Sequence, residues 1–207
     1  MRLLLATSIA LFLFSSCSQN ALSGKRQFTL LPESELQNMA NTQYRQFLSD
    51  KRIVNTSYNG DAAMVNRVGE RVIRAVNKLY AEKGLTDRLK GFDWEVNLVQ
   101  DNQINAWCMP GGKIVVYTGL LPITQNEEAL AAVMGHEVCH ALLQHGNQRM
   151  SQALVQQMGG SALSVALSNR PQETRNLFML AYGVGTQVGV MLPFSRGHEL
   201  EADRWGL

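Results

Sequence analysis

Runs of basic residues, and an excess of either charge, are missing from this sequence. Its 19 lysine and arginine residues nearly balance its 17 aspartate and glutamate residues, which leaves a net charge of +2. A nucleic-acid-binding protein needs a basic patch or stripe to contact phosphates, so this class is excluded. The chain has 207 residues, of which 45% are hydrophobic, and can therefore bury the core of one domain.

Cysteine is also scarce, and Cys17 lies near a targeting signal. Residues 3–14 form an apolar stretch after Arg2, which is too short to span a bilayer but suits a secretory signal. The sequence Phe-Ser-Ser-Cys at 14–17 resembles a bacterial lipobox, in which the signal is removed before a cysteine that receives lipid. We expect a signal peptide over 1–16 and a polar tether over 17–31, after a lipidated Cys17. Ordinary secretion and an uncleaved anchor are the alternatives.

These features predict a protein of the bacterial cell envelope, in the periplasm and lipid-anchored to a membrane, with the outer membrane favoured. The other two cysteines, Cys108 and Cys139, lie inside apolar segments. An exported chain could join them in a disulfide, but apolar surroundings favour two buried free thiols.

Hydrophobic periodicity predicts a mainly helical α+β domain over residues 32–207. Helices are expected at 32–51, 62–83, 128–145, 148–168, 172–191 and after Ser195. The segments 92–99, 105–109 and 113–117 have β-rich patterns, and the Pro-Gly-Gly turn at 110–112 predicts a small antiparallel sheet. Thr124 and Glu127 fit a capping box for the helix that Gly146 is expected to end.

One segment, 176–195, contains no charged residue and is long enough to cross a membrane. It also contains several glycines and Pro193, which make it a poor membrane span. We therefore expect a helix packed in the core of the domain.

The strongest chemical signal is the sequence His136-Glu137-Val138-Cys139-His140. Residues four apart on an α-helix lie about 40° apart in projection, so both imidazoles point the same way, as two ligands of one tetrahedral zinc require. Glu137 projects about 100° from His136, beside the metal, where it can reach a water in the open coordination position. The surrounding helix is apolar on every side and therefore buried, and a metal removes the cost of burying these polar groups. A hydrogen-bonded histidine pair without metal is the alternative.

A catalytic zinc site needs a third protein ligand. His145 projects about 180° from the first histidine on the expected helix, so we expect it to point away and to interact with the helix dipole. In the final helix, Glu199 and Asp203 share a face, whereas Glu201 lies opposite and is expected to be solvated. Glu199 is therefore the candidate ligand and His198 its rival, while Asp203 could accept a hydrogen bond from a ligand imidazole.

Together with the segment Ser-Arg-Gly-His-Glu-Leu-Glu-Ala-Asp-Arg-Trp-Gly at 195–206, this motif resembles the HtpX / type I CAAX prenyl endopeptidase family of zinc metallopeptidases, the gluzincins. The exported branch that includes BepA and LoiP is the most similar, and the resemblance extends from about residue 60 to the C-terminus. It implies a zincin-like fold and one Zn²⁺ held by His136, His140 and Glu199, with Asp203 supporting the site.

The resemblance also implies that Asn105 and Ala106 lie on the strand edge where the substrate backbone docks. An edge strand can pair with an extended peptide, although an ordinary hairpin is the alternative. Relatives continue beyond the second motif with helices that often supply a histidine or arginine near the substrate carbonyl, whereas this sequence ends at Leu207. We assign no residue to that oxyanion-stabilising role, and both a truncated domain and an impaired enzyme stay open.

The sequence therefore predicts an endopeptidase that hydrolyses peptide bonds with a metal-activated water, with Glu137 as general base and acid. The resemblance implies that its substrates are misfolded or assembling envelope proteins, in protein quality control. A catalytically impaired, chaperone-like zinc module that binds envelope proteins is the alternative. A purely structural zinc site is disfavoured, because such sites are usually closed by four protein ligands.

Overall fold

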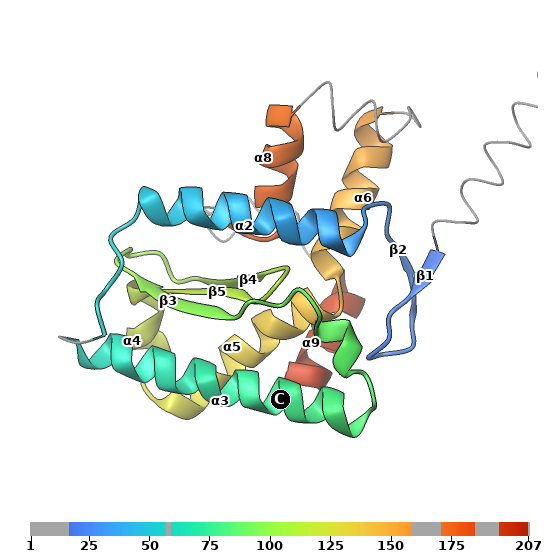
Figure 1. Ribbon diagram of the computed structural model, residues 1–207. Helices are drawn as coiled ribbons and strands as arrows, with labels where there is room; N and C mark the ends of the chain where they lie inside the picture. The colour runs from blue at the N-terminus through green and yellow to red at the C-terminus, as the bar shows by residue number, and fades with distance from the viewer. Residues whose placement is uncertain (1–16, 57–58, 159–170, 185–194, 207) are drawn as a thin grey trace, which may run out of the picture.

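The computed structural model describes residues 17–56, 59–158, 171–184 and 195–206, and a three-stranded sheet lies at their centre (Figure 1). Its strands are β3 (Glu95–Val99), β4 (Ala106–Met109) and β5 (Lys113–Tyr117), with β5 between the other two. The β4–β5 hairpin is antiparallel, as expected, but β3 pairs with β5 in parallel. The expectation of a wholly antiparallel sheet was wrong because the turn at 110–112 folds β5 back between β4 and β3. Since β3 and β4 already run in opposite directions, β5 must run parallel to β3.

Helices cover both faces of this sheet. Alternate residues of a strand face opposite sides. Accordingly, Ile114 and Val116 belong to the core under α3 (Gly60–Glu82) and α5 (Glu127–Leu142), whereas Val115 and Tyr117 belong to the core under α2 (Glu33–Ser49). Figure 1 shows α2 and α3 on opposite sides of the sheet. The expected mainly helical α+β class is confirmed.

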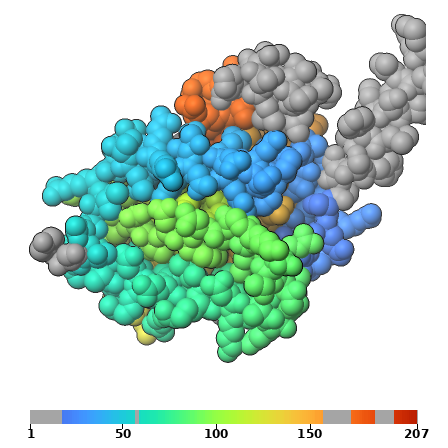
Figure 2. All heavy atoms as spheres, viewed as in Figure 1, coloured from blue at the N-terminus to red at the C-terminus, as the bar shows by residue number. Residues whose placement is uncertain are grey.

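The two long N-terminal helices leave one edge of the sheet at the surface between them (Figure 2). The space-filling view shows the segment that carries β3 at the surface between α2 and α3 (Figure 2). At this edge β3 is partly covered, because Ile53 forms an antiparallel bridge with Val99. The opposite edge strand, β4, pairs with β5 alone among the described strands.

The short segments η1 (Thr86–Leu89), η2 (Thr118–Leu120) and α4 (Leu121–Thr124) connect the larger elements.

The start of α5 differs from the sequence prediction. Helix α5 begins after Asn126, whose side chain accepts a hydrogen bond from the Ala129 amide at 2.8 Å. The expected capping box of Thr124 and Glu127 was therefore wrong. Asn126 supplies the acceptor, and Glu127 instead pairs with Arg67.

The break between α5 and α6 has the largest consequence for the site. Helix α5 ends at Leu142, and Gln144 has a φ of +55°, a left-handed conformation that a continuous helix does not contain. The helix α6 (His145–Met158) starts at the next residue. The expectation that one helix runs to about His145 was wrong. The projection angle of His145, which assumed one continuous helix, therefore does not apply.

The C-terminal helices lie on either side of a gap in the described chain. Helix α8 (Pro171–Ala181) ends earlier than the expected 172–191, and residues 159–168 and 185–191 of the expected helices lie outside the described residues. Helix α9 (Arg196–Gly206) begins after Ser195, whose hydroxyl accepts from the His198 amide at 3.2 Å, as expected for a cap. Among the described helices, none is both long enough and apolar enough to cross a membrane.

Residues 17–31, which we expected to be a tether, contain a β-hairpin packed on the domain. Strands β1 (Cys17–Gln19) and β2 (Arg26–Phe28) are antiparallel. The amides of Asn20 and Gln27 donate to the carbonyl oxygens of Leu142 and Leu143, respectively. Because the last carbonyls of a helix have no partner within the helix, these two side chains complete the C-terminal end of α5.

Helices α5 and α9 pack closely, because the contact is made by two glycines. A β-carbon added to Gly206 would lie 2.7 Å from the backbone nitrogen of His136, and one added to Gly135 would overlap the carbonyl oxygen of Gly206. Any side chain at either position would therefore push the two helices apart.

We predict that Gly206→Ala destabilises the protein by about 1–3 kcal/mol, the usual cost of overpacking a close contact. Chemical denaturation of the variant would measure this change in the free energy of unfolding. Gly60→Ala is the matched control, because a β-carbon there meets no atom within 4 Å. Equal stability of the Gly206 variant and the parent would contradict the close contact.

Candidate metal centre

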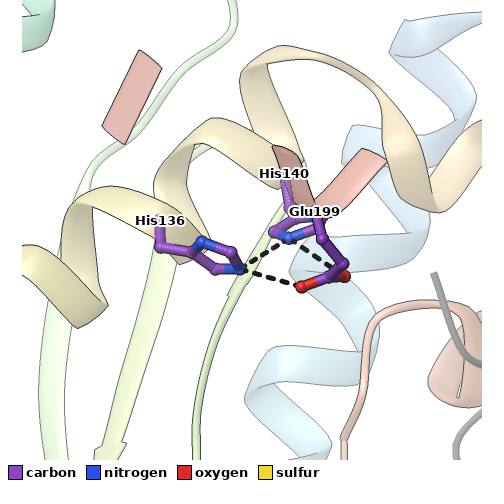
Figure 3. Close-up of side chains that lie close together, drawn as sticks. All are labelled: His136, His140 and Glu199. Carbon is purple, nitrogen blue, oxygen red and sulfur yellow. Dashed lines mark hydrogen bonds and ion pairs between the residues drawn. The ribbon is translucent and has the colours of Figure 1, made fainter. Parts of the chain in front are cut away.

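The described structure brings His136, His140 and Glu199 together (Figure 3). The Nε2 atoms of the two histidines are 2.9 Å apart. The Glu199 carboxylate from α9 lies 3.5 Å from His136 Nε2 and 3.7 Å from His140 Nε2. One nitrogen or oxygen from each side chain lies within 4.8 Å of the others, and no other group of this kind occurs within the described residues.

The two histidines converge because they are one helical turn apart on α5, and Glu199 reaches them because α9 crosses α5 at the glycine contact. His136 Nδ1 lies 2.8 Å from Asp203 Oδ1. An ionised carboxylate only accepts hydrogen bonds, so a neutral His136 carries its proton on Nδ1 and its lone pair on Nε2. This is the form in which imidazole binds a metal.

The donor set fits zinc. Two imidazole nitrogens and one carboxylate oxygen, with a fourth position open, are the protein ligands of several catalytic zinc sites. Two Nε2 lone pairs 2.9 Å apart would repel, so one of these nitrogens must carry a proton unless a cation lies between them. Burial lowers the pKa of His140 to about 2, with further contributions from His145 and His136, so this imidazole is neutral and able to bind a metal.

Glu137 is the carboxylate next to this cluster. Its side chain is half-buried, and burial raises its pKa to about 8, followed by the charge of Glu199, while Arg149 acts in the opposite direction. A divalent cation nearby would lower this pKa. Glu137 can therefore exist in both protonation states near neutral pH, as a residue that accepts and donates a proton requires.

Two expectations for the remaining histidines have clear outcomes. His145 does not point away but is fully buried, with Nδ1 3.1 Å from His140 Nδ1. That expectation was wrong because α5 ends before His145. His198, the rival ligand, stacks on His145 with ring centroids 4.2 Å apart, and its Nε2 lies 3.3 Å from Gln148 Oε1. It therefore lies outside the ligand cluster.

Glu201 was expected to be solvated, but only 6% of its side chain is exposed. Its Oε2 lies 3.0 Å from Lys25 Nζ and 3.5 Å from His145 Nε2. It does lie opposite Glu199 on α9, as expected, but that side of the helix is covered by α6 and the N-terminal hairpin. Helical spacing predicts on which side of α9 a residue lies, but not whether another element covers that side.

Other predicted residues have simpler outcomes. Cys108 and Cys139 are both buried and free, as expected, and burial raises the pKa of Cys139 to about 12, so this thiol is protonated. Asn105 directly precedes β4, and its side-chain amide donates to the Gly183 carbonyl. Ala106 begins β4, the edge strand that packs beside α5.

Arg149 is a residue that the sequence analysis missed. It is 5% exposed, it donates to the Ala181 carbonyl, and its positive charge acts on both Glu137 and Glu199. No local sequence pattern distinguishes it from a solvated arginine, because its burial depends on α8 packing against α6.

Comparison with known proteins identifies relatives. The protein-family model described as Peptidase family M48 matches residues 66–207 of the chain. The mitochondrial metalloendopeptidase OMA1 of Schizosaccharomyces pombe is 30% identical over 200 residues, which cover 95% of this chain and 53% of the relative. OMA1 of Arabidopsis thaliana is 36% identical over 124 residues, which cover 59% and 23%. The beta-barrel assembly-enhancing protease of Yersinia pestis is 27% identical over 150 residues, which cover 69% and 28%. The chain thus spans about half the length of the first relative and less than a third of the other two.

We predict that Asp203→Ala weakens zinc binding about 10- to 100-fold, because His136 loses the acceptor that fixes its proton on Nδ1. Competition with a chelator of known affinity measures the change. Asp203 is 56% exposed, so the fold should tolerate the substitution. Asp87→Ala, which removes a surface ion pair with Lys90, is the control. Unchanged zinc affinity in the Asp203 variant would show that this contact does not support the site.

Proposed function

The chain belongs to peptidase family M48, and we propose that it is a zinc-dependent endopeptidase whose metal is held by His136, His140 and Glu199. The observation that supports this best is the convergence of two imidazoles and one carboxylate from α5 and α9, with ligand atoms within 4.8 Å of one another. Three ligands leave one position open for a reactant, which favours a catalytic site over a structural one.

Zinc in such a site supplies Lewis acidity, which makes water more acidic and polarises a carbonyl. Glu137 then acts as the proton carrier: its carboxylate accepts a proton from the attacking water and delivers it to the nitrogen of the leaving amine. Glu199 and Asp203 keep their positions throughout, since α9 is fixed against α5 by the glycine contact.

The substrate is proposed to bind as an extended peptide along β4. This strand is at an edge of the sheet, and backbone groups at such an edge can pair with an added strand. Asn105 and Ala106 lie at the end of β4 where its pairing with β5 reaches Val116, so they are the proposed contacts for the substrate backbone. Recognition through backbone groups suits unfolded segments of many sequences.

We propose that the natural substrates are misfolded or assembling proteins of the bacterial cell envelope. This rests on the lipobox-like sequence at 14–17 and on similarity to a beta-barrel assembly-enhancing protease. The same features support the exported bacterial branch of the family, with a lipid on Cys17 that anchors the protein to a membrane facing the periplasm. The mitochondrial relatives support only the wider family.

We predict that Glu137→Gln retains zinc but lowers the rate of casein hydrolysis by roughly 10²–10⁴-fold, because glutamine cannot accept the proton. Zinc content and hydrolysis should be measured on the same preparation of the purified protein. Glu128→Gln, on the first turn of the same helix, is the matched control. Undiminished hydrolysis by the Glu137 variant would remove this residue from the mechanism. A parent protein that binds zinc and casein without cleaving it would favour the chaperone-like alternative.

We also predict that Cys17→Ser moves the protein from the membrane fraction to the soluble fraction of bacterial cells, because serine cannot receive the lipid. Fractionation after labelling with a radioactive fatty acid measures both properties. Ser18→Ala, which leaves the cysteine intact, should remain labelled and membrane-bound. Membrane binding of the Cys17 variant without label would argue for an uncleaved anchor instead.

A further inference from the structure

His140 has a buried neighbour on the side of its ring away from the other ligands. Its Nε2 faces His136 and Glu199, while its Nδ1 lies 3.1 Å from Nδ1 of His145. His145 is the first residue of α6 and is fully buried. The contact joins two helices at the left-handed turn that separates them, so its geometry is fixed by the backbone on both sides.

The protons on these two rings are linked. A neutral imidazole donates from one nitrogen and accepts at the other. If His140 is to present a lone pair on Nε2, its Nδ1 must carry the proton and donate it to His145. His145 Nδ1 then accepts, and its own proton lies on Nε2. The reverse arrangement would place the His140 proton on Nε2, where it could be donated to His136 Nε2 at 2.9 Å and would block binding of a metal.

Glu201 favours the first arrangement. Its Oε2 lies 3.5 Å from His145 Nε2, and a carboxylate next to that nitrogen stabilises a proton on it. The carboxylate is held from the other side by Lys25 of the N-terminal hairpin, whose Nζ is 3.0 Å from the same oxygen. The ring of His198 stacks on His145 at an interplanar angle of 15° and restricts its rotation.

The two ligand histidines are therefore supported in parallel ways. Asp203 contacts Nδ1 of His136 directly, and Glu201 contacts Nδ1 of His140 through His145. Both carboxylates come from α9, two residues apart, on opposite sides of the helix. Because Glu199 is on the same helix, α9 supplies one ligand and the supports of the other two.

We propose that His145 and Glu201 are positioning residues that hold His140 in the tautomer that binds zinc, and that Lys25 connects this support to the N-terminal hairpin. The proposal rests on the proposed zinc site. It explains why a histidine and a glutamate are buried together beside the metal ligands, although neither reaches the ligand cluster.

The first test compares two substitutions of one residue. His145→Leu removes the acceptor from His140, and zinc affinity measured by chelator competition should fall about 10- to 100-fold. His145→Gln returns a carbonyl oxygen as an acceptor and should recover part of that loss. Glu127→Gln, which removes an ion pair elsewhere on α5, is the control and should bind zinc as the parent does. Parent-like affinity in the leucine variant, or equal losses in both His145 variants, would overturn the proposal.

The second test needs no substitution. Long-range ¹H–¹⁵N correlation spectra of the zinc-loaded parent report which nitrogen of each imidazole carries the proton. His140 should be protonated on Nδ1, and His145 should be protonated on Nε2 with its Nδ1 as the acceptor. A His145 proton on Nδ1 would overturn the proposal even if the His145 variants failed to fold. A parent that binds no zinc would instead refute the proposed function, and with it the positioning role, so the two failures are distinguishable.

Discussion

The contact between Gly135 and Gly206 is the constraint on which the rest of the site depends. Two helices far apart in the sequence approach closely there, since neither has a side chain at the crossing. Everything that α9 contributes to the candidate centre follows from this approach: the proposed ligand Glu199 and the carboxylates of Asp203 and Glu201. A single additional carbon at the crossing would displace all three together, because they belong to one rigid helix.

The central sheet positions α5, the other helix that contributes to the cluster. Helix α5 packs on one face of a sheet whose central strand is buried on both sides, and this packed core holds the backbone of its two histidines in place. Polar side chains that are buried beside a metal keep their geometry only when partners surround them. Here these partners come from α9, from α6 and from the hairpin at the start of the described chain.

The sequence revealed the parts of the site that depend on one helix at a time. His136 and His140 are one turn apart, and Glu199 and Asp203 are one turn apart, so helical geometry alone placed each pair on one face. It failed where the chain leaves regular geometry or where another element covers a surface. The left-handed residue Gln144 turned His145 inward, and the burial of Glu201 required the hairpin that contains Lys25. The parallel pairing of β3 similarly depends on strand order, which hydrophobic patterns do not encode.

The packed N-terminal hairpin has a mechanical consequence. Only two residues separate Cys17 from Asn20, whose amide completes the end of the helix that carries His136 and His140. A force applied at Cys17 would therefore be transmitted to that helix through only two intervening residues. If the proposed lipid is attached at Cys17, it would fix the orientation of the candidate centre toward the membrane surface, so that substrates could approach from one direction only.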